Sequence, residues 1–580
     1  MNKQDTKSHV EALLQCTRNK VAYVLQHVCL NPSDRNYGGI LHNDNGYAST
    51  RGAIYDFQDV FFVFADKRFP EYYCAPRIGE LLRAHLDFMR RRQQPDGTIG
   101  NEAVGYAMAY EVGFSLLGVC DTYSRYLNTP SDLPGRDEIL ETFQQYILRG
   151  AEAVRNGFAA TANHRWTAIC APLAMADSLF PDARNRDVIE DYLSDGIDVN
   201  ADGLCFEERD PNYTHVANHG LLRLADYWGR IEFLEIIDRT LKFQLEMRQP
   251  NGEPESLFSH RQARGAANLP FGDYVIFARM AKETGNGQYA TVADEQLAWL
   301  LEQEWYPVFS PMAALADDAK YDICGIERVP WQTDVDCFYE QSPFYRFRRR
   351  NVATTLAADP GEHFFTITQG TWGGLVRADN LLSYHVENAI LDGFKIHWGY
   401  GHGGLKPMEI ITLDRERRRF RLFYDDPGTD HIAHFRPREK WGPRRFHTNL
   451  RGTVDVEIAD DGAMTIQIEV GGWEDVPINV QLLLRESCFL KADGGQAAPL
   501  AFGGQSFTDG QDYTLGAPDG SELSIRGLPA SEHRVFLGDH RIVGGQAERR
   551  CHRLIAGVFT PFATTITLNP LPQSHMHVLK

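Results

Sequence analysis

At 580 residues the chain is longer than one hydrophobic core usually supports, so its length predicts two domains. Hydrophobic residues make up 43% and charged residues 24% of the chain, which is typical of globular proteins and argues against a disordered or fibrous class. The formal net charge is -19 and no long lysine or arginine block offsets it. This charge argues against nucleic acid as a partner, and an acidic ligand would have to be short and held by local arginines and histidines.

The chain begins with a polar segment that has no apolar core long enough for a signal peptide. No later segment approaches the roughly 18 uninterrupted apolar residues that a membrane helix needs. We therefore expect a cytoplasmic protein that does not enter a membrane, or a periplasmic or secreted one if a leader has been removed. The ten cysteines are scattered and form no CxxC pair, which favours reduced, buried thiols over disulfides or a structural zinc site.

Helical periodicity runs from the start of the chain to about residue 330. Apolar residues recur at steps of three and four in the segments 78–89, 139–147 and 233–245. Turn dipeptides interrupt the pattern at Asp96-Gly97, Asp202-Gly203 and Asn251-Gly252. This weak repeat predicts a ring of helical hairpins, each of which buries its apolar stripe against its neighbours. An open solenoid is the alternative, which the irregular period disfavours.

The pattern changes to strands after Trp331. Apolar and polar residues alternate over 453–458 and 464–470, and Asp460-Asp461-Gly462 lies between them as a turn, which predicts a β-hairpin. Similar alternation at 364–367 and 564–568 predicts an antiparallel sheet sandwich from about residue 355 onward. We place the boundary between residues 325 and 355, and so expect a helical domain at 1–340 and a β-domain at 341–580.

The first candidate site is Asn163-His164-Arg165, which begins a helical stretch. An amide, an imidazole and a guanidinium in consecutive positions present several donors at a helix N-terminus, where unpaired backbone N–H groups already favour an anion. The alternative is a structural role, with Asn163 as a helix N-cap and His164 partly buried.

The second candidate site is the polar loop that leads from Asp202 into the next helix. It concentrates carboxylates, an arginine, a tyrosine and a histidine, namely Glu207, Glu208, Arg209, Asp210, Tyr213 and His215. This is more polar chemistry than a turn requires, which favours a functional loop. The alternative is a solvated loop with Tyr213 as an aromatic residue at the edge of the core.

Two further segments carry candidate ligand-binding residues. Arg261 and Arg264 follow the third Asx-Gly turn and could grip a carboxylate with two hydrogen bonds each, or could form surface ion pairs. Later, two histidines and two aromatic residues are interleaved with glycines, which suits a loop approached closely by a ligand or by the other domain: His385, Trp398, Tyr400 and His402. A structural divalent metal on these histidines is the minor alternative, because their spacing matches no specific ligand motif.

The order of these motifs resembles the polysaccharide lyases of the heparinase II/III and oligoalginate lyase type. The resemblance lies in a helical domain with Asn163-His164, a DG-x-x-x-EE-x-x-x-x-Y loop that ends at Tyr213, and a β-domain that opens with histidine- and glycine-rich strands. Domain order and size agree over nearly the whole chain. The resemblance implies an incomplete (α/α) toroid followed by an antiparallel β-sandwich. It also implies β-elimination of uronic-acid glycosides in the cleft between the domains, with a uronate-containing oligosaccharide or polysaccharide as partner and no required cofactor.

The resemblance also implies roles for single residues. Asn163 and His164 would neutralise the uronate carboxylate while the C5 proton leaves, with Arg261 or Arg264 assisting. Tyr213 would take that proton or return one to the departing O4 oxygen. Three residues could stabilise its phenolate, namely Arg209, His164 and His215. From the β-domain we expect His402 as the second acid or base, with His385 as the alternative. The residues expected to bind substrate are Arg165, Arg209, His215, Arg261, Arg264, His385, Trp398 and Tyr400.

Two other classes of function stay open. A glycoside hydrolase on the same toroid could use Glu207, Glu208 or Asp210 as its pair of carboxylates, and would consume water to give a saturated product. A carbohydrate-binding protein would retain the ligand without turnover. A lyase differs from both because it leaves a conjugated double bond that absorbs in the near ultraviolet.

Overall fold

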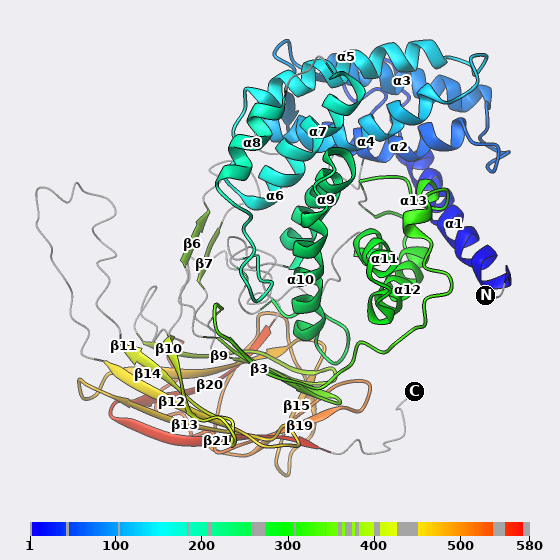
Figure 1. The fold of residues 1–580 in the computed structure, drawn as a ribbon. Coiled ribbons are helices and arrows are strands. Elements are labelled where there is room, and N and C mark those ends of the chain that lie inside the picture. Colours follow the sequence, from blue (N-terminus) through cyan, green and yellow to red (C-terminus); the bar gives the residue numbers. More distant parts are fainter. Residues whose placement is uncertain are drawn as a thin grey trace, which may run out of the picture.

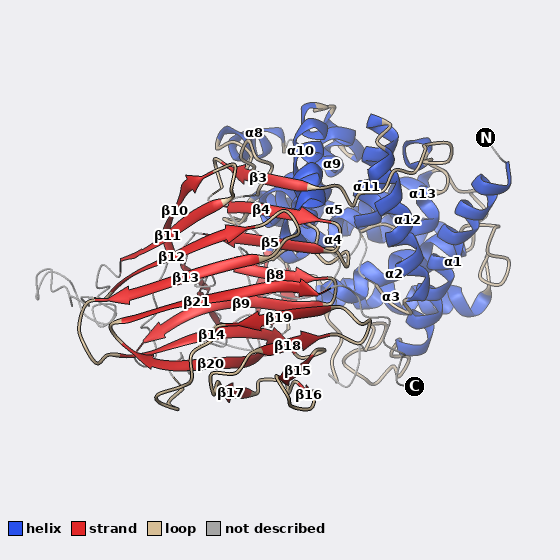
Figure 2. Cartoon of the chain, turned by 90° about the horizontal axis from the view of Figure 1, so that it is seen from below, coloured by secondary structure: helices blue, strands red, loops and turns tan. Residues whose placement is uncertain are grey.

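The computed structural model describes most of the chain and places helices in its N-terminal part and strands in its C-terminal part (Figure 1). The described residues are 3–41, 46–102, 105–181, 185–205, 211–256, 259, 273–306, 309–342, 344–357, 362–365, 374–377, 382–398, 407–425, 450–536 and 551–571. The helices and the strands form separate halves that lie against each other (Figure 2).

The helical half consists of consecutive helices with one small hairpin between them. The helices are α1 (Lys3–His27), α2 (Thr50–Phe64), α3 (Pro76–Arg92), α4 (Ala109–Leu127), α5 (Arg136–Arg155), α6 (Ala162–His164), the π-helical turn η2 (Arg165–Cys170), α7 (Ala171–Leu179), α8 (Arg186–Ser194), α9 (Pro211–Trp228), α10 (Glu232–Met247), α11 (Asp273–Thr284), α12 (Gly287–Glu302), α13 (Met312–Leu315) and the 3-10 turn η4 (Ala319–Tyr321). The hairpin joins β1 (Ile99–Asn101) to β2 (Tyr106–Met108). The apolar stripes expected at 78–89, 139–147 and 233–245 lie on α3, α5 and α10, and most of their residues are buried.

The helices close into a ring because the first helix packs against the last ones. Contacts run from α2 to α4, α7, α9, α11 and α12 in turn, and α1 contacts α2, α12 and α13. The amino group of Lys20 on α1 is fully buried and pairs with Asp56 and Asp59 of α2, at 3.4 and 3.1 Å. The hydroxyl of Thr17 on α1 accepts a hydrogen bond from the backbone of α13. Burial of an ion pair is tolerated only where the partners are close, so Lys20 fixes α1 against α2, while Thr17 joins α1 to α13 at the closure of the ring.

The strands form two large sheets among the described residues. One sheet has nine strands, ordered β10 (Pro407–Asp414), β11 (Arg419–Asp425), β12 (Arg451–Ile458), β13 (Met464–Gly471), β21 (Phe562–Leu571), β19 (Glu522–Arg526), β18 (Tyr513–Gly516), β15 (Phe489–Ala492) and β16 (Ala498–Pro499). The other has eight, ordered β17 (Gln505–Phe507), β20 (Cys551–Phe559), β14 (Pro477–Arg485), β9 (Ala389–Trp398), β8 (Leu382–Val386), β5 (Val352–Ala357), β4 (Phe344–Arg349) and β3 (Val335–Tyr339). A separate pair joins β6 (Glu362–Phe365) to β7 (Gly374–Arg377). Neighbouring strands are antiparallel except β17 and β20, which are parallel.

The two large sheets share one hydrophobic core, to which strands of both contribute. The predicted hairpin is present as β12 and β13, where Val454 lies opposite Ile468 and Val456 opposite Ile466. The apolar residues of both strands are buried and the alternate residues face solvent more, as a half-buried pair of strands requires. The fold class expected from the sequence, a helical toroid followed by an antiparallel β-sandwich, is therefore confirmed.

The two halves are joined through the C-terminal end of α10. Arg346 and Arg348 of β4 are 0% and 2% exposed, and their guanidinium groups donate to the backbone oxygens of Leu245, Glu246 and Arg248. Cations at a helix C-terminus satisfy carbonyls that have no partner within the helix. The last helical turn ends at Tyr321 and the sheet starts at Val335. The assignment of the domains to 1–340 and 341–580 stays a prediction.

Two expectations concern the whole chain. In the part of the chain that the structure describes, no helix combines the length and the apolar character needed to cross a membrane. All ten cysteines are free thiols, seven of them buried and three half-buried.

Candidate active site

The Asn163-His164 step lies where a short α-helix passes into a π-helical turn. Helix α6 ends at His164, η2 follows from Arg165, and α7 continues the same stretch. Glycines let the neighbouring helices approach it: a Cβ atom on Gly113 of α4 or on Gly220 of α9 would collide with the backbone of η2. Single π-helical turns are frequent at functional sites, because the widened turn re-aims side chains.

Helix α9, which carries Tyr213, packs against the segment that contains Asn163 and His164. The α6 and η2 segments both pack against α9, and the Thr167 hydroxyl of η2 donates to the backbone oxygen of Val216. Tyr213 lies one turn before Val216, in the first turn of α9, and is half-buried. Only three residues connect α9 to α10, and the two helices pack together, so the start of α9 lies toward the end of α10, which is bonded to β4. Ten residues before α9, the backbone N–H of Ala201 also donates to the Gln341 side chain of the β-half. The start of α9 therefore lies toward the junction of the two halves.

Asn163 is a buried amide with unsatisfied hydrogen-bonding capacity. The residue is 3% exposed, and its Oδ1 atom has no hydrogen-bond partner among the described residues. An orphaned buried polar group costs on the order of 1–3 kcal/mol, so such a group calls for an explanation. The two ends of an amide exchange on rotation, so this position can offer either a donor or an acceptor to a bound molecule.

His164 is held between a hydroxyl and an aromatic ring. Its Nδ1 atom lies 3.0 Å from the Thr161 hydroxyl. Its ring stacks on Tyr110 of α4, with centroids 4.4 Å apart and planes 6° apart, and meets Phe114 edge-on at 5.5 Å. The imidazole is half-buried. Its orientation is thus fixed by α4 and by Thr161 rather than by solvent.

A row of aromatic rings continues from His164 across the toroid axis. Phe114 stacks near Phe309, Phe309 meets His219 of α9 at 4.7 Å, and His219 meets His215 at 4.6 Å. His215 is 4% exposed. Residues two apart on a helix are separated by about 200° around its axis. His215 therefore faces this row, on another side of α9 from Tyr213.

Arg165 has an internal carboxylate partner. Its guanidinium forms an ion pair with Asp198, and the indole N–H of Trp166 donates to the same carboxylate at 3.1 Å. Asp198 lies between α8 and α9, so the pair ties the π-helical turn to the chain that enters the Tyr213 loop. This arrangement suits a residue that orients the site.

His385 lies in the joint between the halves, on β8, and is 3% exposed. Burial lowers the pKa of His385 to about 4, while Asp392 and Glu255 act in the opposite direction. Glu255 accepts hydrogen bonds from the hydroxyls of Thr355 and Ser383, and Arg485 grips Asp392 with two bonds of 2.7 Å. We call Glu253, Glu255, Arg346, His385, Asp392 and Arg485 the interdomain network.

The other predicted residues lie outside the described residues. They are Glu207, Glu208, Arg209, Asp210, Arg261, Arg264, Tyr400 and His402, together with the side chain of Trp398. Among the side chains that the structure describes, no group of histidine, cysteine, aspartate or glutamate is arranged to hold a metal ion.

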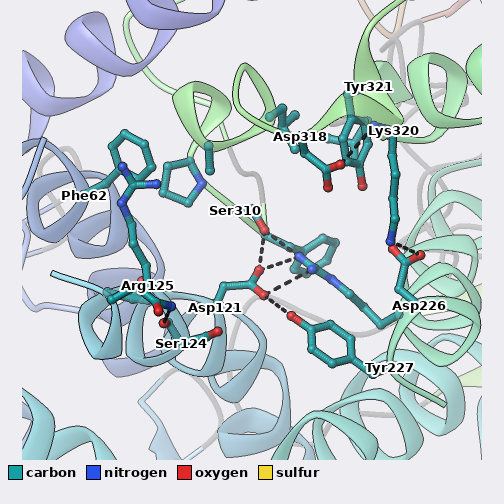
Figure 3. Close-up of a pocket in the computed structure, with 18 of the residues that line it drawn as sticks. Phe62, Asp121, Ser124, Arg125, Asp226, Tyr227, Ser310, Asp318, Lys320 and Tyr321 are labelled. Atoms are coloured by element: carbon teal, nitrogen blue, oxygen red, sulfur yellow. Dashed lines mark hydrogen bonds and ion pairs between the residues drawn. The ribbon is translucent and has the colours of Figure 1, made fainter. Parts of the chain in front are cut away.

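A separate hollow of about 790 Å³ opens at the far end of the same helices (Figure 3). Arg223 and Tyr227 near the end of α9 converge there on Asp121 of α4, and Lys320 pairs with Asp226 at 2.8 Å. Tyr227 is fourteen residues from Tyr213, or about 20 Å along α9. His219 and Phe309 are among the lining residues of this hollow, and the same two rings belong to the aromatic row that leads to Phe114 and His164. Its main charged groups are already paired with each other, which favours a structural role.

Several residues of the site were missed in the sequence, among them Tyr110, Phe114, His219 and Phe309. Three of them did leave a signal, because Tyr110 and Phe114, like His219 and the predicted His215, are four residues apart and so share one face of a helix. Arg51 of α2 also lies over the Phe114 ring, at 5.4 Å, and pairs with Glu111 at 3.1 Å. Only the packing of α2, α4 and α9 around one axis brings these groups together.

Solved structures with a similar fold cover 96% of this chain. A mutant of the heparan sulfate lyase HepC from Pedobacter heparinus is 14% identical, with 83% of that chain covered and a TM-score of 0.51. A heparinase III is 10% identical, with 85% covered and a TM-score of 0.57. A heparinase III with methylated lysines is 13% identical, with 84% covered and a TM-score of 0.51. No family model matches the chain, and no curated protein matches its sequence. The chain therefore has the fold of heparinase-type polysaccharide lyases, as the sequence resemblance implied.

Proposed function

We propose that the protein is a lyase that cleaves uronic-acid glycans by β-elimination, with its active site at the junction of the toroid and the β-sandwich. One observation carries the proposal: helices α6 and α9 pack together, so that the buried, unsatisfied amide of Asn163 and the oriented imidazole of His164 share a region with Tyr213. The shared fold supports it, because lyases of this kind occur among the similar structures.

Charge neutralisation is the first requirement of this reaction. The C5 proton of a uronate is hard to remove because the adjacent carboxylate is already negative, and the intermediate places more charge on the same oxygens. Preorganised donors lower that barrier. Asn163 and His164 are suited to this role because the first is buried and the second is held in one orientation. Arg261 and Arg264 are proposed to assist, and Arg165 to orient the pair through Asp198.

Proton transfer is the second requirement. Tyr213 is proposed to take the C5 proton or to return a proton to the departing O4 oxygen. A tyrosine has an ordinary pKa near 10, so nearby donors must stabilise its phenolate. We propose Arg209 and His164 for this role, since His215 faces another side of α9. His402 is the proposed second acid or base, because His385 is buried in the interdomain network. Trp398 and Tyr400 are proposed to contact the sugar.

Tyr213→Phe tests the proposal most directly. The variant removes one hydroxyl from a half-buried position, so we expect folding to be retained and turnover to fall by about 10²–10⁴-fold. The measurement is absorbance of the unsaturated product in the near ultraviolet during incubation with a panel of uronate oligosaccharides. Tyr227→Phe is the matched control, because Tyr227 lies on the same helix about 20 Å away, and it should retain turnover.

The products distinguish the alternatives. Mass spectrometry would show a saturated product, heavier by one water, for a hydrolase that uses Glu207, Glu208 or Asp210. Retention of the oligosaccharide without product would indicate a binding protein. Near-full activity of Tyr213→Phe, or a saturated product, would overturn the proposed lyase mechanism.

A further inference from the structure

A second hollow, of about 570 Å³, lies beside the small hairpin of the helical half. We call it the hairpin pocket. Its lining includes the end of α3, the start of α2 and both hairpin strands, with Thr50, Arg92, Asn101 and Tyr106 and the carboxylates of Asp96 and Glu102. The proposed reaction uses none of these residues.

The base of the hairpin pocket is held rigidly. The backbone N–H of Thr50, in the first turn of α2, donates to the Glu102 carboxylate at 3.2 Å. The Asn101 side chain donates to Glu111 of α4 at 2.8 Å, and Glu111 also pairs with Arg51. The strands β1 and β2 are thus tied to two helices of the ring. A rigid base is what a binding site needs, because little conformational entropy is then lost on binding.

Two side chains at the pocket have the properties of a sugar-acid contact. Tyr106 is 56% exposed and so offers a large aromatic surface. Arg92, in the last turn of α3, is partly exposed; it lies 3.7 Å from the Glu102 carboxylate and donates to the backbone oxygen of Arg35 at 3.4 Å. The pair with Glu102 is longer than a direct hydrogen bond and a guanidinium has five N–H donors, so Arg92 can still donate to an anion. Asp96 and Glu102 supply carboxylates to the same lining, so Arg92 is the group of the pocket that can bind the acid of a sugar beside the exposed ring.

The hairpin pocket is next to the proposed reaction centre. Strand β2 passes directly into α4, so Tyr106 is only four residues before Tyr110, whose ring stacks on His164. Four residues span at most about 14 Å. Arg51, which follows the pocket residue Thr50, lies over Phe114, the other ring against His164. A chain of sugars bound at His164 could therefore extend into this pocket.

We propose that the hairpin pocket is a subsite for an acidic sugar residue of the substrate, one that lies outside the bond that is cleaved. Tyr106 provides the surface on which the sugar ring stacks, and Arg92 binds its carboxylate or sulfate. The proposal rests on the proposed lyase function, since it extends the same substrate. This contact would make the protein prefer longer oligosaccharides that carry an acidic sugar at this position.

The test compares substrates of different length. We expect Tyr106→Ala and Arg92→Gln to raise KM for uronate octasaccharides by about five- to tenfold, with kcat unchanged, because a contact remote from the reaction adds uniform binding. With the shortest oligosaccharide that is cleaved, both variants should match the unmodified protein. Tyr106→Phe, which keeps the ring, should retain most of the affinity.

Matched controls separate the pocket from general surface effects. Arg91→Gln removes the neighbouring arginine of α3, which does not line the pocket and donates to the backbone of Tyr37, and Phe502→Ala removes an exposed aromatic residue of the β-half. Neither should change KM. Equal effects of Tyr106→Ala on short and long substrates, or no effect on either, would overturn the subsite.

Calorimetry keeps this test independent of turnover. Titration of uronate octasaccharide into the unmodified protein and into Tyr106→Ala measures binding whether or not the bond is cleaved. If no substrate is turned over but Tyr106→Ala binds about five- to tenfold more weakly, the lyase function fails and the subsite stands. Equal affinities in this titration would reject the subsite even for an active lyase.

Discussion

The imidazole of His164 is oriented from two directions. Thr161 contacts Nδ1 at 3.0 Å and the Tyr110 ring covers one face, so the ring plane and the position of Nε2 are both fixed. When the Thr161 hydroxyl donates to Nδ1, the ring proton of a neutral histidine is on Nε2. A donor on Nε2 is what stabilisation of a carboxylate requires. At the scale of single residues, the orientation of His164 is therefore as important as its identity.

Thr161→Val tests this orientation. Valine has nearly the shape of threonine, so packing is kept while the hydrogen bond to Nδ1 is lost. A hydrogen bond of this kind contributes about 0.5–1.5 kcal/mol, so we expect kcat to fall about three- to tenfold with little change in KM. Thr161→Ser, which keeps the hydroxyl, should restore kcat. If valine and serine lower kcat equally, the packing around Thr161 matters and the hydrogen bond does not.

Local patterns in the sequence predicted whole elements well. The three- and four-residue spacing at 233–245 corresponds to α10, and the alternation around Asp461-Gly462 corresponds to β12 and β13. Both depend on neighbours in sequence, which periodicity records. The π-helical turn at Arg165 and the strand order of the eight-stranded sheet depend on contacts between residues far apart in the sequence, which periodicity does not predict. The candidate site shows the same division: Asn163 and Tyr213 stood out as motifs, whereas Phe309 did not.

At the scale of secondary-structure elements, no sequence motif predicted that α10 and β4 would be joined by buried arginines. The sequence shows Arg348-Arg349-Arg350 as a short basic cluster, which reads as solvated surface. In the structure, Arg346 and Arg348 point from β4 into the end of α10, and Arg349 pairs with Asp460 on the surface. Alternate residues of a strand face opposite sides, so the two buried arginines belong to one face. Strand periodicity thus explains the arrangement after the fold is known.

Arg346→Met is expected to destabilise this joint strongly. It removes the cation that pairs with the buried carboxylate of Glu255 at 3.7 Å and two hydrogen bonds to the backbone oxygens of Glu246 and Arg248, and loss of one partner of a buried ion pair costs about 3–5 kcal/mol. Arg349→Met on the same strand removes only an exposed ion pair and should cost less than about 1 kcal/mol. Urea unfolding followed by circular dichroism measures both. Similar losses for the two variants would contradict the role assigned to Arg346, and Glu255→Gln should restore part of the stability lost in Arg346→Met.

On the scale of the whole molecule, the ring and the sandwich are each stabilised by buried polar groups as well as by apolar cores. Lys20 fixes α1 of the ring against Asp56 and Asp59 of α2. Arg485 ties β14 both to Asp392 in the sheet and to Glu253 in the helical half, at 3.1 Å. The two halves meet at this joint, so the geometry of the proposed site depends on groups well away from it. The sequence could not show this dependence, because the partners are far apart along the chain.

Buried histidines in both halves make the stability of the molecule depend on pH. Burial lowers the pKa of His85 in the ring to about 3 and that of His385 in the joint to about 4, against an ordinary value of 6.5. The unfolded chain therefore binds protons below about pH 6.5 that the folded protein does not, so stability is full above that pH and falls as the pH is lowered toward 4. The pKa values of the Asp59 and Glu253 carboxyl groups, raised by burial, act in the opposite direction, whereas those of Glu255 and Asp392, lowered by nearby arginines, act in the same direction as the histidines.

Comparison with a variant isolates one histidine. His85 stacks on Phe57 at 3.7 Å and its Nδ1 contacts the backbone oxygen of Gly38 at 2.8 Å, a bond that a glutamine amide can replace. His85→Gln should therefore remove one titrating group and flatten the dependence of the unfolding free energy between pH 6.5 and 4 by about 1.4 kcal/mol per pH unit. Urea unfolding at several pH values measures that slope. If His85→Gln has the same slope as the unmodified protein, His85 is protonated in the folded state and the ring must open around it in acid.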